Sequence, residues 1–304
     1  MEERIASLLA TAGPLTGTEI CDALGDASFA QWQACVRSPR LALRRVGRRY
    51  LRLDTKVEGY ARLSPSILRE FLTYTVVGLA GDEAALDRRA AEVEAHIRAV
   101  SRDKLQLARE VVSDIAARAT GGSSGAAGVD RFCVVLAGDV VYDMAHDVPR
   151  PERSTGTLVQ GSDLDLVFLV DDAAPDEMVA RLDRLTYEKK VQYLANPAFR
   201  EEIDYVVKSF GRLREQAQRG DFKAMVACKI FDEAVMLLGS EALFAAGKEL
   251  LRERGVTEWL RGLEAAAIRS REKAEQHLLA ADDGALGAEE MLLFYTELES
   301  EEFE

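Results

Sequence analysis

Apolar and polar residues in the first 40 positions follow the spacing of three short helices. Hydroxyl side chains stand where the second and third helices would begin, and a glycine stands where the second would end. The residues behind this expectation are an apolar face (Ile5, Leu8 and Leu9), capping hydroxyls (Thr16, Thr18 and Ser28) and helix ends (Gly25 and Pro39). The pattern therefore predicts three successive helices at the start of the chain.

Residues 41–53 carry strand-forming side chains on both sides of Val46-Gly47, which predicts a β-hairpin. Three helices followed by a hairpin is the order of a winged helix-turn-helix domain, and residues 1–55 resemble that family. The resemblance implies a recognition helix at about Ser28–Arg37 and a wing in the hairpin. The arginines through which it implies DNA contact are Arg44, Arg45, Arg48 and Arg49. A small helical protein-interaction module fits the same pattern, so both alternatives stay open.

Residues 82–119 hold the longest helical pattern of the chain. Apolar residues from Leu86 to Val111 alternate steps of four and three positions, as in a coiled coil, and Lys104 interrupts them once. Two interpretations fit this stripe. One is an amphipathic helix packed on its own domain, and the other is a seam through which two copies of the chain form a homodimer. Without evidence for a partner, the first is favoured.

The stretch at 121–128 is rich in glycine and serine and predicts a break before a new domain. Apolar runs after it predict four strands and two helices, and the pattern is helical again from Lys223 to the end. The expected strands are 131–137, 157–160, 164–170 and 202–209, and the expected helices are 140–147 and 176–194. This order predicts an α+β fold with a small mixed sheet.

The chain has 304 residues, a net charge of −13 and 48% hydrophobic residues, which excludes general disorder. Residues 1–72 contain eight acids and eleven bases, or +3, so the remaining residues carry −16. This acidic majority repels nucleic acid, and DNA contact would need the local arginine patch. No apolar run reaches the ~18–20 residues of a membrane span, and the N-terminus lacks a signal pattern. Four scattered cysteines and three histidines argue against zinc and favour a reduced cytoplasmic protein without membrane contact.

Two aspartates stand at the start of an apolar strand, in the sequence Gly161-Ser-Asp-Leu-Asp165. Alternate residues of a strand share a face, so Asp163 and Asp165 project together. Two unpaired carboxylates at a buried strand are costly, so a cation is expected, and oxygen ligands without nearby histidine favour Mg²⁺ or Mn²⁺. Asp204, 41 residues after Asp163, interrupts another β-branched run, and a neighbouring strand could deliver it to the same edge. The alternative is an exposed edge whose aspartates face water.

At these residues the chain resembles the polymerase-beta-like nucleotidyltransferase superfamily, over about residues 131–255. The matching residues are Gly156-Thr157, Gly161-Ser162-Asp163-Leu164-Asp165 and the third carboxylate, Asp204. The resemblance implies catalysis with two divalent ions ~3.5–4 Å apart, with the three aspartates as catalytic residues and metal ligands. It implies transfer of a nucleotide from an NTP to a hydroxyl of RNA, protein or a small molecule. The nucleotide-binding residues that it implies are Gly138, Asp139, Ser154, Thr155, Gly156, Gly161 and Ser162.

One feature departs from the family. Its Gly-Ser turn is Gly138-Asp139 here, and it stands 25 residues before Asp163. An aspartate at this position repels phosphate. Either Arg150, Arg153, Ser154 and Thr155 supply the phosphate contacts instead, or nucleotide binding is altered or lost. The alternative function is therefore a DNA-binding transcriptional regulator or antitoxin-like protein with a degenerate transferase domain. Lys189 and Lys190, on the helix after the aspartate pair, could reach phosphates, but a solvated surface position is the favoured interpretation.

Together the two resemblances divide the chain into four expected domains. They are a winged-helix-like domain at 1–72, a helical connector at 73–120, a nucleotidyltransferase-like domain at 121–255 and a helical region at 256–304.

Overall fold

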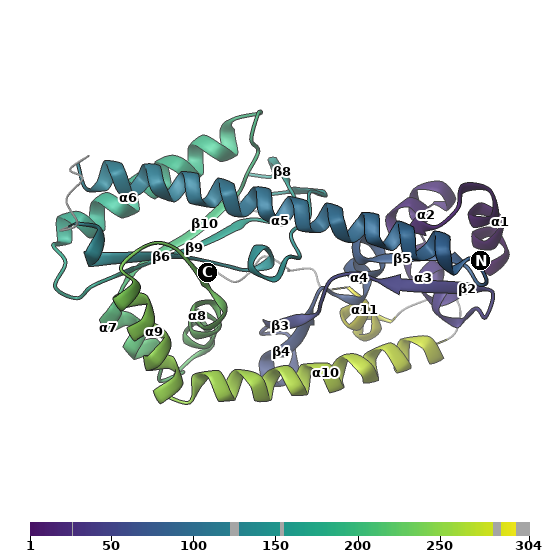
Figure 1. Cartoon of the computed structure of the whole chain (residues 1–304). Coiled ribbons are helices and arrows are strands. Elements are labelled where there is room, and N and C mark those ends of the chain that lie inside the picture. Colours follow the sequence, from purple (N-terminus) through teal and green to yellow (C-terminus); the bar gives the residue numbers. More distant parts are fainter. Residues whose placement is uncertain (26, 122–127, 153–154, 282–286, 296–304) are drawn as a thin grey trace. The chain divides into compact units, whose positions relative to one another are not determined.

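The computed structural model describes residues 1–25, 27–121, 128–152, 155–281 and 287–295 (Figure 1). The described chain forms two compact units. The first contains residues 1–97 and the described residues from 262 onward, and the second contains residues 98–261. Each unit combines helices with small sheets, which confirms the predicted α+β class. The boundaries between the two units fall inside the long helices α5 (Glu83–Ala119) and α10 (Val256–Ala280). The sequence pattern instead predicts domain boundaries at 72, 120 and 255.

Three helices open the first unit, as the sequence predicts. The Thr16 hydroxyl accepts a hydrogen bond from the Glu19 amide (3.3 Å), the Glu19 carboxylate accepts one from the Thr16 amide (2.7 Å), and Gly25 ends the second helix. The prediction that Ser28 caps the third helix was wrong, because that helix follows Ala27 and has no side-chain cap. The bounds are α1 (Glu2–Ala12), α2 (Gly17–Leu24) and α3 (Ser28–Arg37).

The strands that follow α3 belong to two different sheets, so the predicted hairpin at Val46-Gly47 was wrong. The first strand pairs with β5 and the second pairs with β4, not with each other. Buried Val46 donates its amide to the Tyr74 carbonyl (2.9 Å), which holds the chain against the end of α4 instead of turning it back. The bounds are β1 (Leu15–Thr16), β2 (Leu41–Arg45), β3 (Tyr50–Leu53), the 3-10 helix η1 (Glu58–Tyr60), β4 (Ala61–Ser64), α4 (Ile67–Tyr74) and β5 (Thr75–Leu79), and β5 lies between β1 and β2.

A buried ion network holds α4 and α10 together in the first unit. The Glu70 carboxylate accepts hydrogen bonds from Arg49 (2.5 and 2.7 Å) and from Arg271 (3.2 Å), and Arg45 lies 2.9 Å from it. Glu275 accepts from Arg49 (2.7 Å) and Arg271 (2.8 Å). Burial alone would raise the pKa of the Glu70 carboxyl, but the Arg49 hydrogen bond and the nearby guanidinium charges hold it below its usual value. The network therefore consumes much of the arginine charge of this unit.

Replacing Glu70 with glutamine (Glu70→Gln) is expected to lower the free energy of unfolding by ~3 kcal/mol, because the buried guanidinium of Arg271 and the partly buried one of Arg49 lose a buried carboxylate charge. Urea unfolding followed by circular dichroism measures the change. Glu83→Gln is the matched control, since Glu83 pairs with Arg44 at the exposed surface, where a pair contributes about 0–1 kcal/mol. Equal, small shifts in the two variants would contradict a stabilising role for the network.

The second unit is built on a mixed sheet in the order β10-β9-β6-β11. β9 runs parallel to β10 and antiparallel to β6, and β11 is antiparallel to β6. The bounds are β6 (Phe132–Ala137), β9 (Leu164–Val170), β10 (Ile203–Ser209) and β11 (Val235–Gly239), with a separate pair β7 (Pro149–Pro151) and β8 (Leu158–Gln160). Within this unit, the strands β6, β8, β9 and β10 and the helix α6 (Asp176–Ala195) lie where the sequence predicts them. The strands β7 and β11 were not predicted.

Two predicted helical stretches differ in the structure. Residues 140–147 contribute to one 3-10 turn, η3 (Asp139–Tyr142), and β11 interrupts the helix expected from Lys223 onward. A short apolar run such as 235–238 fits a strand or a buried helix equally well by pattern, and here it pairs with the edge of β6. The remaining elements are η2 (Val129–Arg131), α7 (Phe210–Gln216), α8 (Phe222–Glu233) and α9 (Glu241–Glu253) in the second unit, and α11 (Ala288–Phe294) in the first.

Alternate residues of β9 divide this sheet into two faces. Leu164, Leu166 and Phe168 are fully buried in an apolar cluster with α6 and the C-terminal half of α5. Asp165 therefore faces the opposite side, on which α7, α8 and α9 pack (Figure 1). The apolar cluster fixes which residues of the strand reach the other face.

The long helix predicted at 82–119 is confirmed by α5, and its apolar stripe is buried within the chain. Leu86, Ile97 and Val111 are almost completely inaccessible to solvent. Lys104, which interrupts the stripe, is also buried, and its ammonium donates to the Glu201 carboxylate (2.6 Å) and to the Gln160 carbonyl (2.8 Å). This packing supports the amphipathic-helix interpretation, and the homodimer stays a prediction.

The long helices carry charged residues along their length. Among the described residues, no helix has the length and hydropathy that crossing a membrane requires.

Candidate metal centre

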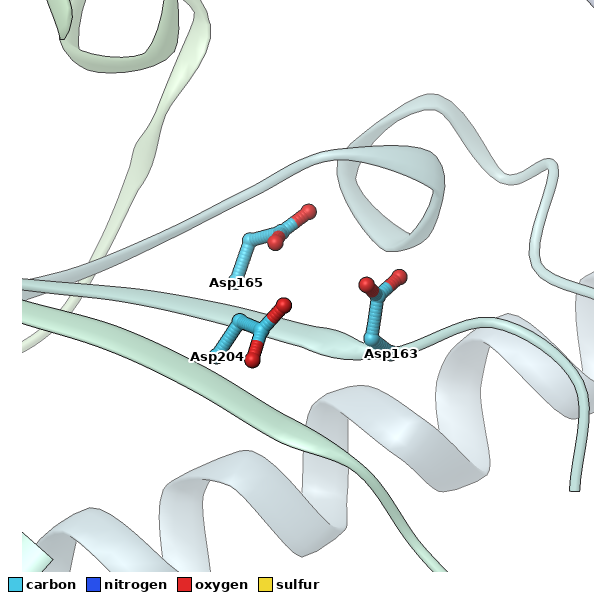
Figure 2. A group of neighbouring side chains, drawn as sticks. All are labelled: Asp163, Asp165 and Asp204. Atoms are coloured by element: carbon cyan, nitrogen blue, oxygen red, sulfur yellow. The ribbon is translucent and has the colours of Figure 1, made fainter. Parts of the chain in front are cut away.

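Three aspartates from two neighbouring strands come together at one end of the second unit's sheet. Asp163 directly precedes β9, Asp165 is the second residue of β9, and Asp204 is the second residue of β10. One carboxylate oxygen from each lies within 4.8 Å of the others. Figure 2 shows the three side chains on the same side of the strands. The structure therefore brings together the three aspartates that the sequence singles out, in an arrangement that could hold a metal ion.

The register of the parallel strands explains this convergence. Asp165 lies opposite Asp204, and Leu164 lies opposite Ile203. Both Leu164 and Ile203 are fully buried in the apolar cluster, so the next residue on each strand points to the other face. A shift of one residue would expose the apolar side chains and bury the acids. The apolar packing therefore sets the position of the carboxylates.

Two basic side chains lie at the edges of the triad. The Lys190 ammonium, from α6, donates to the Asp204 carboxylate at 2.7 Å. The Arg150 guanidinium lies 3.6 Å from Asp163 and 2.8 Å from Glu202, and it also donates to the Gly161 carbonyl at 2.8 Å. Asp165 is 7% exposed, and the site is therefore only partly open to water.

Two glutamates precede β10 and add negative charge beside the triad. Burial raises the pKa of Glu202 to about 7; the Arg150 charge opposes this rise, and the charges of Asp163 and Asp204 increase it. Burial also raises the pKa of Glu201, against the opposing charge of Lys104. Burial would lower the pKa of Lys190, but its hydrogen bond to Asp204 raises it above the usual value. The ammonium of Lys190 is therefore charged at neutral pH.

The turn at Gly138 lies directly against the triad. Its φ of +74° is in the left-handed region, and a Cβ atom there would lie 2.0 Å from Oδ2 of Asp165. The Gly138 amide donates to Glu233 of α8 (3.2 Å), which also accepts from the Tyr142 hydroxyl (2.5 Å) and pairs with Lys229 (2.9 Å). The amide that the resemblance assigns to a nucleotide therefore has a carboxylate of the chain as its acceptor here.

Asp139 is tied to the residue that precedes the aspartate pair. The Ser162 hydroxyl donates to the Asp139 carboxylate at 2.8 Å, and the Ser162 amide donates to the His146 carbonyl at 3.0 Å. Gly161 packs against the same carbonyl so closely that a Cβ atom would lie 1.7 Å from it. Four of the predicted nucleotide-binding residues, namely Gly138, Asp139, Gly161 and Ser162, are thus gathered beside the triad.

The remaining predicted nucleotide-binding residues form a separate turn. Thr155 donates its amide (2.8 Å) and hydroxyl (2.6 Å) to the buried Glu152 carboxylate, and the Gly156 amide donates to the Glu152 carbonyl (2.8 Å). Arg153 and Ser154 lie outside the described residues. A role of Thr155 and Gly156 in nucleotide binding stays a prediction.

Three of the four arginines predicted to contact DNA have carboxylate partners in the first unit. Arg44 pairs with Glu83 and Asp87, and Arg45 and Arg49 both belong to the Glu70 network. Arg48 is exposed. Paired guanidinium groups are less available to phosphates, and DNA binding stays a prediction.

The helix predicted to read DNA is covered by the chain's own C-terminal elements. Gln33 and Arg37 of α3 donate to backbone carbonyls at the end of α10, at 2.8–3.0 Å. The rings of Phe29 and Trp32 lie 5.2 and 5.4 Å from the ring of Phe294 in α11. This face of α3 therefore already has partners.

Several residues at the site are not evident from sequence spacing. A solvated position was favoured for Lys190 over phosphate contact, and its pairing with Asp204 was not predicted. The roles of Glu202 and Glu233 had no sequence motif. The sequence feature that could have revealed Glu202 is its position two residues before Asp204, at the first residue of the strand predicted at 202–209. Lys190 and Glu233 reach the site from helices, where chain spacing does not reveal the partner.

Comparisons of the chain with protein-family models, with curated protein sequences and with solved structures found no match. The function is therefore inferred from the geometry of the site.

Gly138→Ala is expected to displace the Asp165 carboxylate, because the new Cβ atom needs the space of its Oδ2 atom. The variant should lose Mn²⁺ binding in a titration and unfold at a lower temperature. Gly156→Ala is the matched control: its φ of +69° brings similar backbone strain, but no atom of the described residues lies within 4 Å of the added Cβ. If both variants lose Mn²⁺ binding equally, the close approach of Gly138 to Asp165 has no special role.

A buried lysine further along β10 gives the protein a pH-dependent stability. Lys208 is 6% exposed, donates to the Gln216 side chain (2.9 Å), and burial lowers its pKa to about 8. Between pH 8 and 10.5 the unfolded chain keeps a proton that the folded chain has released, so this residue's contribution to stability rises with pH.

The free energy of unfolding of the wild type, minus that of Lys208→Met, is therefore expected to increase between pH 8 and 10.5 by up to ~3 kcal/mol. Urea unfolding at several pH values measures this difference. Lys223→Met removes a surface lysine and controls for the loss of a basic residue. A difference that stays constant with pH would contradict the prediction.

Proposed function

We propose that the second unit is a metal-dependent nucleotidyltransferase. An acceptor hydroxyl attacks the α-phosphorus of an NTP, the bond between the α- and β-phosphates breaks, and pyrophosphate leaves. The observation that supports this most strongly is the meeting of Asp163, Asp165 and Asp204 from two adjacent strands, within 4.8 Å. The glycine-containing turns at Gly138 and Gly161 lie beside these carboxylates, as the resemblance to the polymerase-beta-like superfamily implies. RNA, a protein side chain or a small molecule can supply the hydroxyl.

The ligand atoms fit a hard divalent cation. The three aspartates offer oxygen donors, which Mg²⁺ and Mn²⁺ prefer, and the absence of a Cβ atom at Gly138 leaves room for Asp165. Asp163, Asp165 and Asp204 would hold the metal. When bound, the metal supplies charge that lowers the pKa of the acceptor hydroxyl and stabilises the phosphate oxygens in the transition state.

The residues of the chain orient the reacting groups. Arg150 links Asp163 to Glu202 and to the Gly161 carbonyl, and in the metal-free site the Lys190 ammonium holds the Asp204 carboxylate by a hydrogen bond. The bond between Ser162 and Asp139 joins the two turns that flank the triad. Asp204 accepts the proton of the acceptor hydroxyl or serves as the third ligand.

A DNA-binding regulator with a degenerate transferase domain is the alternative, and it has less support. Carboxylate partners already hold Arg44, Arg45 and Arg49, and α10 and α11 cover one face of α3. A degenerate site would also have little reason to keep three costly carboxylates together.

The test is label transfer from each radiolabelled NTP in the presence of Mg²⁺ or Mn²⁺, with RNA, protein and small-molecule acceptors. Asp163→Asn/Asp165→Asn is expected to lower transfer by about 100-fold or more, because the charge that holds the metal is lost. Asp171→Asn is the matched control, since Asp171 follows the far end of β9 and pairs with Arg131 (3.5 Å). Salt-sensitive, sequence-specific DNA retention without turnover would favour the regulator.

A further inference from the structure

Lys190 contacts the triad from outside the sheet. It lies on α6, which packs against the edge strand β10, and its Nζ atom lies 2.7 Å from Oδ1 of Asp204. The side chains of Lys190 and Asp204 are 29% and 16% exposed, so this ion pair is largely shielded from water. An amino group thus holds one of the three carboxylates that the proposed function assigns to metal.

A divalent ion at the triad and the ammonium of Lys190 compete for the same carboxylate. Metal–oxygen distances of about 2.0–2.6 Å would place the ion close to the Asp204 oxygens. Two cations that share one carboxylate in a shielded site repel each other strongly. Binding of the metal therefore favours separation of Lys190 from Asp204.

We propose that Lys190 is a resident counter-cation of Asp204, which a divalent ion displaces, so that this lysine sets the metal affinity of the site. This inference rests on the proposed function, because it requires metal binding at the triad. Lys190 stabilises the site while no metal is bound and weakens metal binding in return.

The displaced ammonium stays beside the site. Leu182 and Leu185 of α6 are buried in the apolar cluster, which anchors the helix against the sheet. A tethered cation next to a metal-bound polyphosphate lies where it can contact the phosphate oxygens. Lys190 thereby favours anionic substrates once the metal has bound.

The neighbouring lysine provides a matched comparison. Lys189 also lies on α6, and its ammonium pairs with Asp114 of α5 at 2.9 Å, away from the triad. If Lys190 served merely to fasten α6, the two lysines would have equivalent effects.

The first measurement is a calorimetric Mn²⁺ titration of the full chain and its variants. Lys190→Met is expected to tighten Mn²⁺ binding by about 5- to 10-fold, the effect of removing one competing ion pair, and Lys189→Met should change it less than about 2-fold. Lys190→Arg keeps the charge and should bind Mn²⁺ more like the wild type. Unchanged or weaker Mn²⁺ binding by Lys190→Met would overturn the inference.

The second measurement uses the wild-type chain and does not depend on a variant that folds. Acetic anhydride labelling with peptide mass spectrometry compares the reactivity of Lys190 and Lys189 with and without Mg²⁺. Mg²⁺ should increase the labelling of Lys190 and leave that of Lys189 unchanged, and no increase at Lys190 would contradict its displacement.

The proposed function and this inference fail in different ways. If the wild type binds no Mn²⁺, or binds it equally after Asp163→Asn/Asp165→Asn, the metal site is wrong and the inference falls with it. If the wild type binds Mn²⁺ through the aspartates while Lys190 neither responds to metal nor affects its affinity, the proposed function survives and the inference is overturned.

Discussion

The parallel pairing of β9 with β10 is the constraint on which the candidate site depends. Leu164 and Ile203 are opposite each other and fully buried, so Asp165 and Asp204 must lie opposite each other on the other face. Apolar packing provides the free energy that holds two like charges together, because any other register would expose the cluster. The acids are thus placed by residues that take no part in their chemistry. The same face of β10 continues to buried Lys208, which shows that α7 and α8 also cover polar groups there.

The two units handle buried charge in different ways. In the first, Glu70 and Glu275 are surrounded by Arg45, Arg49 and Arg271, so the basic groups outnumber the acids. At the candidate site, Asp163, Asp165, Asp204 and Glu202 share the nearby cations Arg150 and Lys190. In the first arrangement the chain's own guanidinium groups balance the carboxylates, as expected of a structural network. Among the described ion pairs of the second arrangement the carboxylates outnumber the basic side chains, and a divalent cation would offset this difference.

Local patterns were enough to predict the elements that carry the triad. The alternation around Asp163 and Asp165 and the apolar run around Asp204 each depend on a few neighbouring residues. The hairpin at Val46-Gly47 was predicted wrongly because a strand's partner depends on distant residues, here those of β5 and β4. The contacts of Lys190 and Glu233 were not predictable for the same reason. Each side chain reaches the site from a helix, and the packing of that helix against the sheet cannot be read from neighbouring residues. Sequence thus reveals which acids meet, but not which groups neutralise them.

The acids at the Gly138 turn bear directly on where an anionic substrate could bind. Asp139 accepts the Ser162 hydroxyl, and Glu233 accepts the Gly138 amide, so carboxylates of the chain already hold donors that a phosphate would use. A phosphate at this turn would meet two like charges and would have to replace existing hydrogen bonds. The cations of Arg150 and Lys190 lie instead at Asp163 and Asp204, whereas the Gly138 turn lies against Asp165. Under the proposed function, electrostatics favours approach of a polyphosphate from the side of α6 and β7, and the departure at Gly138-Asp139 would then move the phosphate contacts away from this turn.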